Sequence, residues 1–188
     1  KEIAKEIAKT AATDNAARLA LSATALRDAV LSGAPFAGLL AQAKSLGTDD
    51  KTLAPLAPFA EAGVPNSQML AQELHALLPA MLKISGAQAP AGGFLEKLQA
   101  NAGRLVRIRP VAAPAGNDAS AVLARLEIDT ARGDIEAALG DLSKLPDAIR
   151  APAVTWIAKV QLRQAALTAA KKFASDTARA LGPQAGAQ

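Results

Sequence analysis

Residues that could carry covalent, redox or metal chemistry are scarce in this sequence. Its 188 residues contain no Cys, no Tyr and a single His, His75. This composition excludes disulfide frameworks, thiol nucleophiles and Cys-type zinc sites, and leaves no second His for a relay. The sequence also has no phosphate-binding loop, nucleophile elbow or helix with paired His. We therefore expect a protein that is not an enzyme, with no catalytic residues, no metal site and no cofactor.

The remaining titratable residues have simple structural interpretations. Asp49 and Asp50, like Asp134 and Glu136, fall where helices are predicted to begin, and a negative charge is favourable at that end of the helix dipole. His75 lies beside a stripe of leucines with no second His or Cys in the chain. We interpret it as a structural residue.

A basic segment is the most informative charged feature. No acidic residue falls between Glu96 and Asp118, whereas four basic residues do, which equals the whole net charge of +4. These are Lys97, Arg104, Arg107 and Arg109. Such a strip favours an anionic partner: phospholipid headgroups, nucleic acid or an acidic protein face. Because no aromatic base-stacking platform or known motif accompanies it, we expect no nucleic-acid binding.

The same segment is amphipathic if it is helical. Apolar Phe and Leu side chains then share one face, opposite Lys and Arg, which is typical of a helix lying in a membrane interface. The lipid-binding residues predicted are Phe94, Leu95, Lys97, Leu98, Arg104, Leu105, Arg107 and Arg109. Two alternatives stay open: the apolar face is buried in a bundle with its arginines solvated, or residues 104–109 are extended before Pro110.

Composition and periodicity predict the fold class. Apolar residues make up 51% of the chain but aromatic residues only 3%, and 48 residues are Ala. Alanine suits closely packed helices and cannot fill the core of a sheet. We predict an all-α protein of antiparallel helical hairpins or a bundle, with a long C-terminal helix and no substantial sheet.

Gly and Pro mark where the predicted helices end. A first hairpin joins residues 14–31 to residues 36–46 through Gly33 and Pro35. The apolar stripe of its first helix is formed by Leu19, Leu26, Val30 and Leu31. A Pro-broken stretch follows, and then a helix from Ser67 with Pro79 as a kink. A second hairpin turns at Gly133, and a long helix runs from near Pro152 to Leu181.

These elements suggest four segments. Residues 1–13, with a four-residue Lys-Glu-Ile-Ala repeat, are a coiled-coil remnant or an engineered helical leader. Residues 14–84 form an N-terminal helical block, residues 85–116 a linker that contains the basic segment, and residues 117–188 a C-terminal helical block. Within the last block we predict partner binding at Gly133, Asp134 and Trp156, the only Trp. The alternative for Trp156 is a core anchor that packs against the Gly133 hairpin.

The C-terminal third resembles a known family. The residues that carry the likeness are Leu126, the run Ala131-Arg132-Gly133-Asp134-Ile135-Glu136-Ala137-Ala138-Leu139, Leu142, Leu145, Ala153 and Trp156. This pattern looks like the mitofilin domain, and more closely like the alphaproteobacterial mitofilin-like membrane proteins. Residues 16–36 and 94–110 are also similar to that group, so the resemblance covers most of the chain after about residue 14.

The resemblance implies a role beyond what the residues themselves indicate. Such proteins have an N-terminal transmembrane helix, a coiled coil and a helical domain facing the periplasm or intermembrane space. They shape inner membranes at crista-type junctions and tether them to outer-membrane assembly proteins. No membrane-spanning run or signal peptide is visible, so the resemblance implies an anchor upstream of Lys1 and a periplasmic location for this domain.

Together these observations predict a non-enzymatic, membrane-organising protein. Its helical domain would contribute to inner-membrane shaping, of crista-type or intracytoplasmic membrane, as a homo-oligomer that binds partners and contacts anionic phospholipid peripherally. The alternative is a helical protein-interaction scaffold without lipid binding. In that case the basic strip faces an acidic protein surface or the core.

Overall fold

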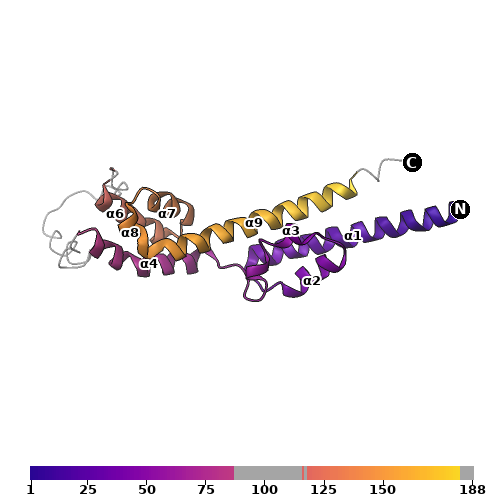
Figure 1. The fold of residues 1–188 in the computed structure, drawn as a ribbon, viewed down its shortest axis with the longest axis horizontal. Coiled ribbons are helices and arrows are strands. Elements are labelled where there is room, and N and C mark those ends of the chain that lie inside the picture. The colour runs from indigo at the N-terminus through magenta and orange to yellow at the C-terminus, as the bar shows by residue number, and fades with distance from the viewer. Residues whose placement is uncertain (87–115, 117, 183–188) are drawn as a thin grey trace, which may run out of the picture. The chain divides into compact units, whose positions relative to one another are not determined.

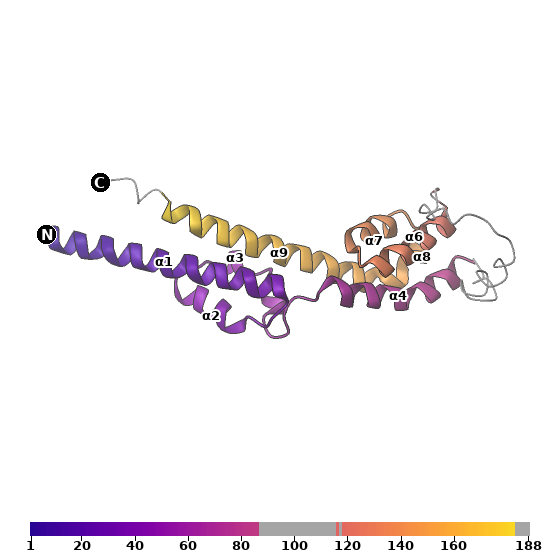
Figure 2. The ribbon, with the colours of Figure 1, turned by 180° about the vertical axis from the view of Figure 1, so that it is seen from behind.

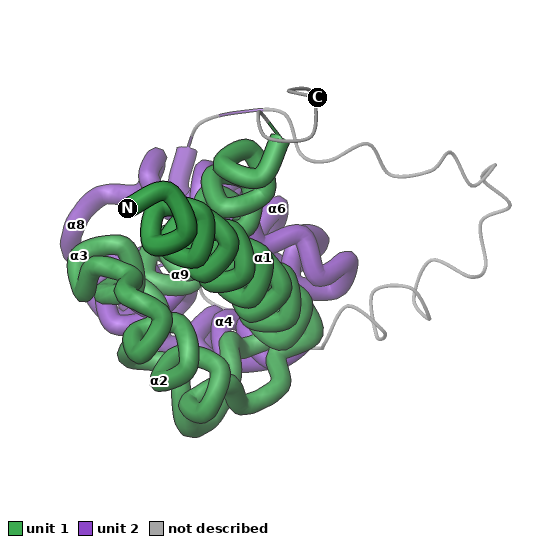
Figure 3. The backbone as a smooth tube through the Cα atoms, turned by 90° about the vertical axis from the view of Figure 1, so that its right-hand side faces the viewer, with its two compact units in different colours: residues 1–66, 161–188 green, residues 67–160 purple. Residues whose placement is uncertain are grey.

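The computed structural model describes residues 1–86, 116 and 118–182. Every regular element among these residues is a helix, and the last α-helix is long, which confirms the predicted all-α fold class (Figure 1). The helices group into two compact units, drawn in different colours in Figure 3. Unit 1 comprises residues 1–66 and 161–188, and unit 2 comprises residues 67–160.

Unit 1 is built on a long helix, α1 (Glu2–Ser32), and on the part of α9 (Val154–Leu181) that follows residue 160. The shorter elements are α2 (Ala37–Ser45), α3 (Asp50–Leu53) and the 3-10 turn η1 (Ala57–Phe59). In Figures 1 and 2, α2 lies beside the C-terminal part of α1. The buried core is Ala23, Leu26, Val30, Phe36, Leu40, Ala43, Leu53, Leu56, Ala60, Val64, Ala166, Ala170, Phe173 and Ala174.

Two glycines close the turn between α1 and α2. Gly33 ends α1 in the left-handed region, with φ 75°, as its position in the sequence predicts. Gly63 has φ 80°, and a Cβ atom placed on it would lie 2.0 Å from the carbonyl oxygen of Gly33. The backbone N–H of Phe36 donates to the carbonyl oxygen of Ala60 at 2.8 Å in the same region. Only glycine permits this close approach of two backbone segments.

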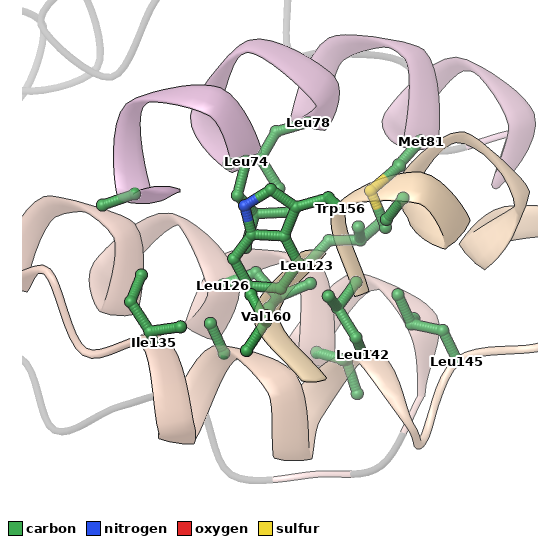
Figure 4. Packing of buried hydrophobic residues seen from close by; sticks show 14 of the residues in the cluster. Leu74, Leu78, Met81, Leu123, Leu126, Ile135, Leu142, Leu145, Trp156 and Val160 are labelled. Atoms are coloured by element: carbon green, nitrogen blue, oxygen red, sulfur yellow. The ribbon is translucent and has the colours of Figure 1, made fainter. Parts of the chain in front are cut away.

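Among the described residues of unit 2, four α-helices and the start of α9 pack around one core. The helices are α4 (Ser67–Ile84), α6 (Ala119–Arg132), α7 (Ile135–Leu142) and α8 (Asp147–Arg150), followed by the 3-10 turn η2 (Ala151–Ala153). Leucines dominate this core, with Trp156 among them (Figure 4). The helix α4 continues through Pro79, whose side chain is exposed.

The two units differ from the consecutive blocks that the sequence suggested. The helix α4, expected in the N-terminal block, shares its core with α6 and α7, and α9 after residue 160 packs with α1 and α2. The reason is that apolar residues run along the whole of α9: Trp156 and Val160 serve one core, and Ala166, Ala170 and Phe173 serve the other.

The N-terminal leader is continuous with the first helix. Residues 1–13 form no separate segment, because α1 runs without a break from Glu2 to Ser32, and the side chains of residues 1–15 are exposed. Most of the predicted linker, residues 87–115, lies outside the described residues. Over the described ranges, no helix is both long enough and apolar enough to cross a membrane.

Candidate partner-binding site around Gly133 and Trp156

The turn between α6 and α7 is built by Gly133 and Asp134. Gly133 adopts φ 71° and its N–H donates to the carbonyl oxygen of Thr130 at 3.2 Å, which ends α6. The carboxylate of Asp134 accepts a hydrogen bond from the N–H of Ala137 at 3.0 Å and so begins α7. The prediction that a helix begins at Asp134 is confirmed. These two residues set where one helix ends and the next begins.

Trp156 lies inside unit 2 rather than on its surface. Its side chain points among leucines of α4 and α6 (Figure 4), and the residue is only 3% exposed. The indole N–H donates to the carbonyl oxygen of Leu70 at 2.8 Å, so the polar atom of the ring is satisfied where it is buried. The core-anchor interpretation is therefore confirmed. Burial of the ring favours this alternative over direct contact with a partner, and the partner-binding role of Trp156 stays a prediction.

The three predicted partner-binding residues thus do not form one surface. Asp134 is exposed, Gly133 is half-buried and Trp156 is in the core. What they share is a structural task in unit 2, because the turn and the indole both fix helices around the same core. Besides the hydrogen bond from Trp156 to Leu70, an ion pair links α9 to α4. The ammonium group of Lys159 lies 2.8 Å from both carboxylate oxygens of Glu73.

An ion-pair cluster that the sequence did not indicate links α6 to α7. The guanidinium of Arg125 donates to Asp141 at 2.7 Å, and Lys144 donates to the same carboxylate at 2.6 Å. Arg125 also donates to the carbonyl oxygen of Gly116 at 2.7 Å. The Lys144 contact is an i, i+3 pair that helix spacing could have indicated. Arg125 is sixteen residues away from Asp141, and only the packing of α6 against α7 brings the two together.

The protonation of this cluster follows from its contacts. Burial by itself would raise the pKa of Asp141, but the hydrogen bonds from Arg125 and Lys144 outweigh burial and the pKa is lowered. The pKa of Asp129 is raised, first by burial and then by the negative charges of Asp141 and Asp134. An ionised carboxylate that two cations already neutralise is suited to holding helices together rather than to transferring protons.

Unit 1 contains a shallow cleft that offers an alternative site. Its volume is about 270 Å³, and the lining residues are Ala16, Leu19, Thr48, Thr52, Phe173, Asp176, Thr177 and Ala180. Asp176 is the acidic residue in this lining, and a hydrogen bond from Lys172 lowers the pKa of its carboxyl group. The cleft therefore combines apolar side chains with hydroxyl groups and an ionised, paired carboxylate.

Metal ligands do not gather in the part of the chain that the structure describes, which holds no group of three or more His, Cys, Asp or Glu placed to bind a metal ion. His75 is exposed on α4.

The eight residues of the predicted lipid-binding strip all lie outside the described residues. They are Phe94, Leu95, Lys97, Leu98, Arg104, Leu105, Arg107 and Arg109.

One surface feature had not been anticipated from the sequence. Ile3, Ile7 and Leu21, all on α1, are 77%, 64% and 74% exposed, and none of them belongs to the unit 1 core. Leu31, expected in the apolar stripe of this helix, is also exposed, at 52%. Leu26 and Val30 of the same stripe are buried as expected, together with small residues such as Ala20 and Ala23. The helix α1 therefore shows apolar side chains to solvent.

Comparison with known protein families, with curated proteins and with solved structures finds no match.

Proposed function

We propose that this chain is the helical domain of a non-enzymatic, membrane-organising protein. It would contribute to inner-membrane shaping through self-association, partner binding and peripheral contact with anionic lipid. The observation that carries the lipid part of the proposal is the stretch after Glu96, in which four basic residues and no acid precede Asp118. The partners, an inner-membrane anchor upstream of Lys1 and a periplasmic location follow from the resemblance to mitofilin-like proteins and belong to the same proposal.

The contacts of unit 2 support a role in binding rather than catalysis. The pattern of residues that resembles the mitofilin domain coincides with residues that hold this unit together: Gly133 ends α6, Asp134 begins α7 and Trp156 joins α9 to α4. The buried carboxylate of Asp141 is neutralised by Arg125 and Lys144. A helical unit held together in this way can present surfaces to partners.

The electrostatic contribution to lipid contact has a definite scale. Each Lys or Arg close to an anionic membrane surface contributes about 1 kcal/mol, so four contribute about 4 kcal/mol. That contribution falls as salt is raised, because dissolved ions screen the attraction between the two sets of charges. Insertion of Phe94 and the neighbouring leucines would add to it through the hydrophobic effect. The result is reversible binding rather than permanent anchoring.

Co-sedimentation with vesicles tests the lipid part. The chain is mixed with neutral phosphatidylcholine vesicles, or with the same vesicles containing an anionic phospholipid. We compare the parent chain with Arg104→Glu/Arg107→Glu and with the matched control Lys51→Glu/Lys171→Glu. The control makes the same change in net charge at two exposed lysines that form no ion pair with any described residue.

The expected outcome is binding to anionic vesicles only. The Arg104→Glu/Arg107→Glu variant should bind at least about 30-fold more weakly, because the two lost attractions alone amount to about 2 kcal/mol. The control should bind like the parent chain. Equal loss in both double variants would mean that overall charge, and not this segment, governs binding. Equal binding by the parent and the Arg104→Glu/Arg107→Glu variant would refute the lipid part of the proposal.

One observation favours the second candidate function, a protein-interaction scaffold without lipid binding. Helix α1 exposes the large apolar side chains of Ile3, Ile7 and Leu21, and exposed apolar surface is available for contact with another protein. The vesicle experiment separates the two candidates. A chain that pellets with neither kind of vesicle would fit the scaffold and not the membrane-contacting domain.

A further inference from the structure

We draw no further inference here: the strongest candidate, the apolar surface of helix α1 in unit 1 with its exposed Ile3, Ile7 and Leu21, is interrupted by Thr10 and Asp14, and nothing in the structure shows what covers it.

Discussion

Replacing Gly63 with alanine should destabilise unit 1 by about 3 kcal/mol, from two separate causes. The backbone of Gly63 has φ 80°, and a residue with a Cβ atom loses about 1–2 kcal/mol in that left-handed region. The new Cβ would also lie 2.0 Å from the carbonyl oxygen of Gly33 and 2.7 Å from its carbonyl carbon. Both are backbone atoms that cannot rotate away, so the turn must shift, at a cost of about 1–3 kcal/mol.

Two other glycines provide matched controls for these causes. Gly47 has φ 94°, but no atom lies within 4 Å of the position that a Cβ atom would take there, so Gly47→Ala should lose only the conformational part, about 1–2 kcal/mol. Gly38 lies within α2 at ordinary dihedral angles and also has open space around it. Gly38→Ala should therefore stabilise the protein by about 0.5–1 kcal/mol, because alanine is the better helix former.

Native-state hydrogen exchange of the α1 and α2 amides measures the effect in unit 1 directly. For amides that exchange through unfolding of unit 1, a loss of about 3 kcal/mol corresponds to exchange about 150-fold faster. Trp156, the only Trp, provides a separate fluorescence signal from unit 2 during urea unfolding. The reasoning is refuted if Gly63→Ala is no more destabilising than Gly47→Ala, because the close approach to Gly33 would then carry no energetic weight.

Three further predictions concern unit 2. Trp156→Phe should lower the free energy of unfolding by about 2 kcal/mol, because the smaller ring leaves space in a packed core and the carbonyl of Leu70 loses a hydrogen bond. Urea unfolding followed by circular dichroism measures this change. A loss below about 0.5 kcal/mol, within the range of ordinary surface substitutions, would contradict the anchor role. Asp141→Asn should lower the free energy of unfolding by about 2 kcal/mol, because it removes the carboxylate that pairs with Arg125, whose side chain is only 15% exposed. The control is Asp147→Asn, at an acid that pairs with Arg150 and whose side chain is 92% exposed, and it should change stability by at most about 0.5 kcal/mol. Equal effects would show that the cluster is no stronger than a surface pair. Asp129 has a raised pKa, so its ionised form is disfavoured in the folded state, and Asp129→Asn should stabilise the protein at neutral pH. The gain in stability of this variant over the parent chain should shrink as pH falls through the raised pKa, because Asp129 then becomes protonated. The lowered pKa of Asp141 has the opposite sign: its stabilisation is present above the ordinary aspartate pKa and is lost as pH falls through the lowered value, so the Asp141→Asn deficit should shrink only in strong acid. Unfolding curves of the parent chain and of the two variants, recorded from about pH 2 to about pH 8, check both predictions. If the free energies of unfolding of the two variants, each relative to the parent chain, varied with pH in the same direction, the pKa directions given for Asp129 and Asp141 would be contradicted.

The helix ends were predictable from the sequence because they depend on residues within one turn of each other. Gly33 and Gly133 take the left-handed conformation that ends a helix, and Asp134 caps the helix after it. The buried face of α1 was predictable only in part. Of the predicted stripe, Leu26 and Val30 are buried and Leu19 packs against the core, but Leu31 is exposed, and Ala20 and Ala23 are buried as well. In a chain with so many alanines, the apolar pattern distinguishes the faces of a helix only weakly.

The candidate site was predictable only in part. The sequence singled out Gly133, Asp134 and Trp156, and the structure places all three in unit 2. Whether a Trp on an amphipathic helix contacts a partner or its own core depends on which helix lies opposite, and here that helix is α4, whose Leu70 carbonyl accepts the indole N–H. Leu70 and Trp156 are eighty-six positions apart along the chain, so the local sequence gives no sign of the contact.

By itself, the sequence determined the helical class, the helix ends and the lack of thiol and paired-histidine chemistry, because composition and capping act locally. The tertiary structure alone decided that α4 joins α6 and α7, that α9 serves two cores, and that Arg125 meets Asp141. It also decided that Gly63 touches Gly33. Each of these contacts joins residues that are far apart in the sequence. An apolar stripe indicates that one face of a helix is buried, but it does not indicate which helix packs against that face.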